Sequence, residues 1–160
     1  MSAHVVSWDA IALRIDGARV NALARERAAG HVDDINITFH AGGIRVAGRK
    51  KVAIVPIPFS AEVHSIQVDG KRLLVPVSGI PSILLPILRG IVAAKVPAGV
   101  SIHRPFTFVV QLERFIPPFV DVEIKTIRID DGGLAIELGA GGIRSSVLRS
   151  PIRDSHPGRD

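Results

Sequence analysis

The sequence writes one hairpin-like pattern twice. Residues 63–77 read VHSIQVDGKRLLVPV, and residues 124–138 read IKTIRIDDGGLAIEL. With a shift of about 61 residues, aliphatic positions fall on aliphatic positions and Asp69 falls on Asp130. Each copy alternates apolar and polar residues on both sides of a glycine-containing turn, which is typical of a β-hairpin. Self-similarity at one fixed spacing indicates an internal duplication.

An irregularity in the pattern repeats as well. The apolar alternation slips by one residue early in each copy, which predicts one β-bulge at His64–Ser65 and another at Lys125–Thr126. The alternative is that any two aliphatic hairpins look alike. The shared irregularity, the shared turn aspartate and a helix-like segment before each copy favour the duplication.

The remaining elements predict an α+β fold. One helix is expected over residues 18–30, capped by Asp16, and another over residues 81–95, with Pro81 in its first turn and a kink at Pro86. Strands are expected at residues 5–15, 34–40, 43–48, 51–68, 73–79, 100–103, 106–112, 119–129 and 134–138. We predict two helices packed on a strongly curved antiparallel sheet.

This pattern gives one domain over residues 1–140, built from pseudo-repeats of about 18–79 and 80–140. From residue 141 to residue 160 the chain is rich in Gly, Ser, Arg and Pro, so a flexible basic tail is expected there.

Composition restricts the class of protein. Hydrophobic residues make up 47% of the 160 residues and aromatic residues only 4%, so the chain is a folded domain with an aliphatic core. It has no cysteine, which excludes disulfides and thiolate metal ligands. No leader-like start is visible, and three prolines interrupt the most apolar stretch, residues 80–100. We expect a soluble, cytoplasmic protein, or an exported one if a leader was removed.

The segment 81–95 is unusually apolar for a surface helix. Its large aliphatic residues cover an arc of roughly 200° on a helical wheel, whereas a surface helix needs a stripe of only about 100° or somewhat more. Such a helix requires apolar neighbours on two sides. One neighbour is the sheet, and the other is the core itself, a second subunit, a membrane or an apolar ligand.

Three stretches together resemble the tubular lipid-binding (TULIP) superfamily, in particular its small bacterial members. They are GIRVAG (43–48), the IPF…VHSIQVDGKRLLVPV segment (57–77) and FIPPFVDVEIKTIRIDDGGLAIEL (115–138). The resemblance covers about residues 5–140. It implies a half-barrel in which a curved sheet wraps a helix, apolar lipid tails lie between them, and no catalysis takes place. Because the chain is short for the superfamily, a shallow groove, or one completed by dimerisation, is expected.

We therefore predict a lipid or another long apolar molecule in a groove between helix 81–95 and the sheet. The candidate groove residues are aliphatic and serve an ordinary core equally well: Leu84, Ile87, Leu88, Ile91, Val63, Ile66, Val68, Val75, Ile124, Ile127, Ile129 and Ile136. The candidates for a lipid headgroup or an anionic membrane surface are Arg45, Arg49, Lys50 and Lys51. The alternative for these four is a solvated hairpin end.

Enzyme signatures are weak. The sequence has no GxSxG nucleophile motif and no HExxH or HxH metal spacing, and HVDD (31–34) with His40 is more typical of a polar connection than of a metal site. GAGGIRSS (139–146) lacks the spacing of a phosphate-binding loop. We expect no catalytic residue, no metal site and no cofactor.

Nucleic acid and a second copy of the chain are the other candidate partners. The net charge of +5 permits nucleic acid, but the basic residues are scattered and aromatic stacking platforms are nearly absent. Arginines of the tail (Arg144, Arg149, Arg153 and Arg159) would give at most nonspecific phosphate contacts. The main alternative to lipid binding is an interaction module that forms a homodimer through the aliphatic helix without a ligand.

Overall fold

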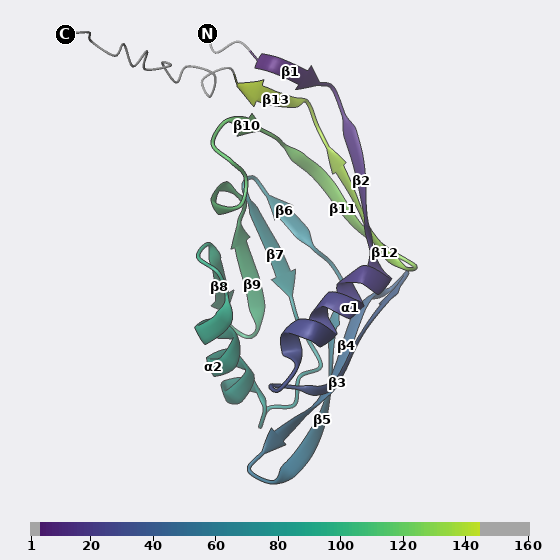
Figure 1. Ribbon diagram of the computed structural model, residues 1–160, viewed down its shortest axis with the longest axis vertical. Helices are drawn as coiled ribbons and strands as arrows, with labels where there is room; N and C mark the ends of the chain where they lie inside the picture. Colours follow the sequence, from purple (N-terminus) through teal and green to yellow (C-terminus); the bar gives the residue numbers. More distant parts are fainter. Residues whose placement is uncertain (1–3, 145–160) are drawn as a thin grey trace, which may run out of the picture.

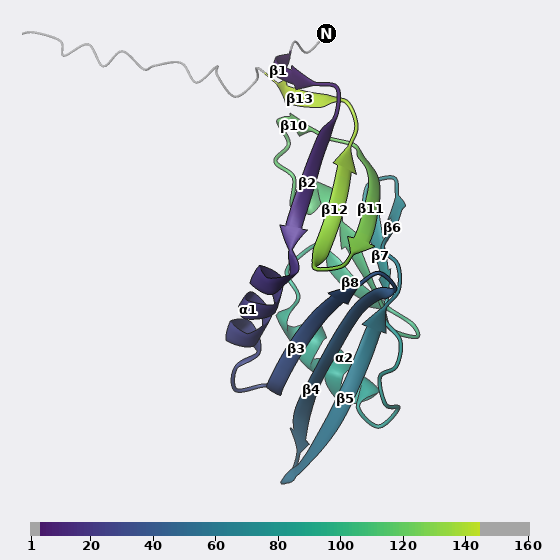
Figure 2. The same cartoon turned by 90° about the vertical axis from the view of Figure 1, so that its right-hand side faces the viewer.

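The computed structural model describes residues 4–144 of the chain. Within this range there are two α-helices, one 3₁₀ helix and thirteen strands, and the strand pairs are antiparallel, so the protein is α+β (Figures 1 and 2). The strands form four small sheets, and none of them is closed or strongly curled. The prediction of one strongly curved sheet was therefore wrong.

Two of the sheets combine strands from both ends of the described chain. The first has the order β11–β12–β2, with β2 at Ile11–Asp16, β11 at Ile124–Asp130 and β12 at Gly133–Leu138. The second has the order β1–β13–β10, with β1 at His4–Trp8, β10 at Val120–Asp121 and β13 at Gly141–Arg144.

The other two sheets come from the middle of the chain. The third has the order β3–β4–β5, with β3 at Asp33–His40, β4 at Gly43–Val52 and β5 at Val55–Val63. The fourth has the order β6–β7–β9–β8, with β6 at Gln67–Asp69, β7 at Arg72–Pro76, β8 at Val100–His103 and β9 at Thr107–Gln111. The helices are α1 (Gly17–Ala28), α2 (Leu85–Lys95) and the 3₁₀ helix η1 (Leu112–Arg114).

Helix α1 begins where the sequence predicted. The Asp16 carboxylate accepts hydrogen bonds from the backbone N–H groups of Ala18 (2.8 Å) and Arg19 (3.1 Å), which would otherwise lack partners in the first turn. Gly17 itself is buried because its backbone lies against Gly132 and the ring of Phe39.

Helix α2 begins later than predicted. Residues 82–84 form a turn, and the helix starts at Leu85, so Pro86 occupies the first helical turn. A proline in the first turn sacrifices no helical hydrogen bond, because the N–H groups there have no partner within the helix. The predicted kink at Pro86 is therefore wrong, and Pro81 lies outside the helix.

The most deeply buried cluster lies under α2. Leu84, Leu88 and Phe106 expose 0%, 8% and 4% of their surfaces. Half-buried side chains from the third and fourth sheets surround this cluster, together with others next to or within α2: Val52, Ile57, Phe59, Val77, Ile80, Leu85, Ile87 and Phe108. The Phe106 and Phe108 rings meet edge to face, with centroids 5.5 Å apart. The helix therefore joins the third and fourth sheets through this cluster.

The doubled pattern forms a hairpin in each copy, β6–β7 and β11–β12. The predicted irregularity at Lys125 is confirmed by a register shift between Ile124 and Thr126. At His64–Ser65 the irregularity is larger than a bulge, because β5 ends at Val63 and β6 begins only at Gln67. A helix followed by strands also occurs twice in chain order. Common descent of the two halves remains a prediction.

The chain ends differ from expectation in two ways. The single strand predicted at residues 5–15 is divided into β1 and β2. Residues 141–144, assigned above to the tail, form β13, whose Arg144 N–H donates to the Phe119 carbonyl (2.8 Å). The rest of the predicted tail, residues 145–160, lies outside the described residues.

We predict that Leu84→Ala lowers the free energy of unfolding by about 2–5 kcal/mol, because it leaves a cavity among close-packed side chains. The adjacent Ile83 is 65% exposed, so Ile83→Ala should change the stability by no more than about 0.5 kcal/mol. Urea denaturation of both variants measures the difference. Similar losses in both variants would contradict the position of Leu84 in the core.

Candidate functional site

One face of the β11–β12–β2 sheet is entirely aliphatic. Residues directly opposite each other in an antiparallel sheet point to the same side, so the strand register defines this face. Its three rows across the sheet are Ile15–Leu134–Ile129, Leu13–Ile136–Ile127 and Ile11–Leu138–Ile124. We call these nine residues the aliphatic face.

The aliphatic face is only partly covered. None of its nine side chains is buried, and Leu13 and Ile15 on the edge strand β2 expose 47% and 39% of their surfaces. The opposite face of the same sheet is polar: Glu137 pairs with Arg128 (3.1 Å) and accepts a hydrogen bond from Thr126 (3.1 Å). The sheet is thus amphipathic, and residues 4–144 cover its apolar side only in part.

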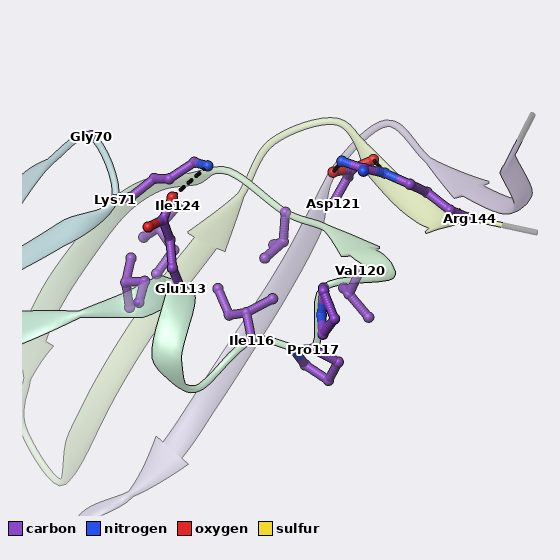
Figure 3. Close-up of a pocket in the computed structure, with 12 residues that line it drawn as sticks. Gly70, Lys71, Glu113, Ile116, Pro117, Val120, Asp121, Ile124 and Arg144 are labelled. Atoms are coloured by element: carbon purple, nitrogen blue, oxygen red, sulfur yellow. Dashed lines mark hydrogen bonds and ion pairs between the residues drawn. The ribbon is translucent and has the colours of Figure 1, made fainter. Parts of the chain in front are cut away.

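A pocket of about 260 Å³ adjoins one end of the aliphatic face (Figure 3). Ile124 belongs both to the face and to the pocket wall. The other apolar lining residues come from η1, the loop after it, β10 and the link between β10 and β11: Leu112, Ile116, Pro117, Pro118, Val120 and Val122. The face and the pocket therefore share an apolar wall at Ile124.

Two ion pairs stand on opposite sides of this pocket (Figure 3). On one side, Lys71 Nζ lies 2.8 Å from Glu113 Oε1, and this hydrogen bond lowers the pKa of the Glu113 carboxyl. On the other side, Arg144 donates to both oxygens of Asp121, with Nε 2.6 Å from Oδ2. His4 Nε2 lies 3.0 Å from the same Oδ2.

The Asp121 carboxylate links three strands, because His4 belongs to β1 and Arg144 to β13. The hydrogen bonds from Arg144 and then His4 hold the pKa of the Asp121 carboxyl well below its ordinary value. The same carboxylate raises the pKa of the Arg144 guanidinium. Asp121 therefore stays ionised, and its hydrogen bonds hold β1, β10 and β13 together at the wall of the pocket.

The predicted groove residues are divided between several parts of the fold. Ile124, Ile127, Ile129 and Ile136 lie together on the aliphatic face. Leu84 and Leu88 instead belong to the core under α2, with Ile87 packed against it.

The remaining predicted groove residues do not join the aliphatic face. Val63 is buried at the end of β5, Ile66 follows in the gap before β6, and Val68 and Val75 belong to the fourth sheet. Val75 pairs with Phe108, which packs against the core under α2. Ile91 lies outside the residues whose side chains the structure describes. The structure thus does not gather the predicted residues into one groove against α2.

The four predicted headgroup residues all have partners within the protein. Arg45 pairs with Glu62 (2.8 Å), Arg49 with Asp34, and Lys51 approaches Asp33 (3.9 Å), while Lys50 donates to the His31 carbonyl (2.6 Å). The Arg45 hydrogen bond also lowers the pKa of Glu62. Three of the four cations thus have a carboxylate nearby.

Some site residues were not predicted. Ile11, Leu13 and Ile15 do alternate in the sequence, but nothing in the sequence pairs their strand with β12. The pocket residues Leu112 and Ile116 lie around a 3₁₀ turn and carry no periodic signal. The register of the folded sheet brings Ile11, Leu13 and Ile15 to the site, whereas the chain around the 3₁₀ turn places Leu112 and Ile116 at the pocket.

Comparison of the chain with models of known protein families, with curated proteins and with solved structures found no match. Within residues 4–144, no group of three or more His, Asp or Glu side chains is placed to hold a metal ion. Neither described helix is long and apolar enough to cross a membrane.

We predict that Asp121→Asn reduces stability at neutral pH and that this deficit shrinks in acid. A carboxyl whose folded pKa lies below its unfolded value of about 3.9 stabilises the fold above that pH, and the contribution is lost as pH falls toward the folded pKa. Unfolding free energies of both proteins between about pH 6 and pH 2 test this prediction. Asp131→Asn, at an exposed turn, is the control. A deficit that is constant with pH would count against the Asp121 linkage.

Proposed function

We propose that the protein binds a lipid or another long apolar molecule along the aliphatic face of the β11–β12–β2 sheet, without catalysis. The observation that carries the proposal is that the described residues cover this face only in part. Nine aliphatic side chains stand in register on one side, none is buried, and the other side of the sheet is polar.

The energetics favour an apolar occupant. Complete burial of a large aliphatic side chain is favourable by about 1.5–3 kcal/mol. The side chains of the aliphatic face are only partly buried, so a ligand that covers them would gain part of this free energy. The nine side chains of the aliphatic face carry no hydrogen-bonding group. The face therefore suits a hydrocarbon chain and offers no hydrogen bond to a polar substrate.

The adjoining pocket closes one end of the proposed binding site along the aliphatic face. An acyl chain that follows the face past Ile124 enters the pocket, whose walls are largely aliphatic and proline side chains. The Lys71–Glu113 and Asp121–Arg144 pairs border this end and offer polar groups to the less apolar part of a ligand. A few polar groups at the rim of an apolar site commonly fix the orientation of a ligand.

The resemblance of the doubled pattern to tubular lipid-binding proteins supports the same ligand class. The proposed location differs from the one expected from the sequence, because Leu84 and Leu88 under α2 already contact the protein's own side chains. The same packing weakens the alternative of a homodimer through this helix. The large exposed apolar side chains include Leu13 and Ile15, and also Ile83 in the turn before α2, but none among the α2 residues whose burial the structure describes.

We predict that Leu13→Asp weakens binding of the fluorescent fatty acid cis-parinaric acid about tenfold or more, because a carboxylate on the aliphatic face opposes a hydrocarbon ligand. Leu13 is 47% exposed, so the fold should tolerate the change, which a thermal melt verifies. Fluorescence titration measures the affinity.

The matched control is Ala12→Asp, which places the same charge one residue away on the opposite face of β2. This variant should bind like the unchanged protein. Absence of parinaric acid binding, or equal weakening in both variants, would overturn the proposal.

A further inference from the structure

The β4–β5 hairpin projects from the end of the third sheet (Figures 1 and 2). Strand β3 reaches only as far as the pair Asp33–Arg49. Beyond that pair, β4 and β5 continue alone through three more pairs, Lys50–Ile57, Lys51–Pro56 and Val52–Val55. We call residues 50–57 the hairpin tip.

The hairpin tip exposes aliphatic side chains where polar ones are usual. Its two-residue turn is Ala53–Ile54, and Ile54 is 92% exposed, more than any other large apolar residue of the described chain, while Val55 is 57% exposed. Ala53 has a φ of 58°, a left-handed conformation that glycine or asparagine adopts at lower cost. The turn thus departs from ordinary turn chemistry in both residues, which is typical of functional positions.

Cations gather directly behind these aliphatic side chains. Lys50 Nζ donates to the His31 carbonyl (2.6 Å), and Lys95 Nζ from the end of α2 lies 2.5 Å from His31 Nε2. With Arg49 and Lys51 they make four cations, against the two carboxylates of Asp33 and Asp34. The base of the tip therefore carries a net positive charge after its internal ion pairs are counted.

The β5 edge of the tip is a poor site for another protein strand, and the tip is too small for a folded partner. Pro56 and Pro58 lie on β5, the edge strand, and each removes a backbone donor that strand pairing would need. A stable protein interface buries about 800 Å² on each partner, and two aliphatic side chains at the end of a narrow hairpin offer far less. Exposed aliphatic side chains at the end of a hairpin, with cations directly behind them, instead match the interfacial region of an anionic membrane.

We infer that the hairpin tip docks on an anionic lipid surface. Ile54 and Val55 enter the boundary between headgroups and acyl chains, while Lys50 and Lys51 lie at the level of the lipid phosphates. This contact is separate from the aliphatic face, and its test does not depend on whether the protein carries a ligand.

The first experiment is sedimentation of the purified chain with vesicles. Vesicles of phosphatidylcholine mixed with phosphatidylglycerol should bind the protein, those of phosphatidylcholine alone should bind it much less, and added salt should weaken binding. Val55→Asp should reduce partitioning about tenfold or more.

Val5→Asp is the matched control. Val5 is also 57% exposed, but it lies on β1, at the opposite end of the molecule (Figure 1). This variant should bind vesicles like the unchanged chain. No preference for phosphatidylglycerol, an unaffected Val55→Asp variant, or equal loss in both variants would overturn the inference.

A second experiment locates the contact. The chain has no cysteine, so Ile54→Cys accepts an environment-sensitive fluorophore at one position only. Its emission should shift to the blue on addition of the anionic vesicles, whereas the same probe at Leu23→Cys, another exposed site on α1 (56% exposed), should not shift. A shift at both sites, or at neither, would contradict docking through the tip. So would a multimer in vesicle-free buffer that Val55→Asp dissociates, because that result would assign the tip to a protein interface.

Discussion

The pairing of β2 with β12 organises the candidate site. Six consecutive residue pairs join residues 11–16 to residues 133–138, so strands from the two ends of the described chain lie side by side. Without β2, the β11–β12 hairpin would present a narrow apolar strip, and isolated hairpins are marginally stable in water. The pairing also fixes the start of α1: the Gly17 N–H donates to the Gly132 carbonyl (2.7 Å), and a Cβ at Gly17 would meet that oxygen at 2.8 Å.

This arrangement separates the packing of the core from the proposed binding. Helix α2 and Phe106 cover the apolar surface of the third and fourth sheets. The aliphatic face receives no equivalent cover from the described residues. At the tip of the β4–β5 hairpin, Ile54 and Val55 are likewise exposed, and this tip lies far from β1 and β13 (Figure 1). A protein that collects an apolar molecule from a membrane would use both features: a tip that contacts the lipid surface and a face that receives the molecule.

The sequence predicted local structure better than it predicted the assembly. Alternation, turn residues and capping located the hairpins and α1, because these signals act over a few residues. The sequence does not distinguish the two roles of Pro86, because a proline suits the first turn of a helix as well as it kinks a later one. Pairing of β2 with β12 and of β1 with β13 joins segments more than a hundred residues apart, and no local pattern encodes that choice. For this reason four residues of the aliphatic face were identified, while Leu13 and the pocket were not.

The central claim is that an apolar molecule covers the aliphatic face. Native mass spectrometry of the purified protein, followed by organic extraction and lipid analysis, tests this claim most directly. The account predicts a reproducible bound mass that extracts as a fatty acid or a phospholipid, and that is reduced in the Ile127→Asp variant. A ligand-free mass in every preparation, or a bound mass that Ile127→Asp retains in full, would contradict it.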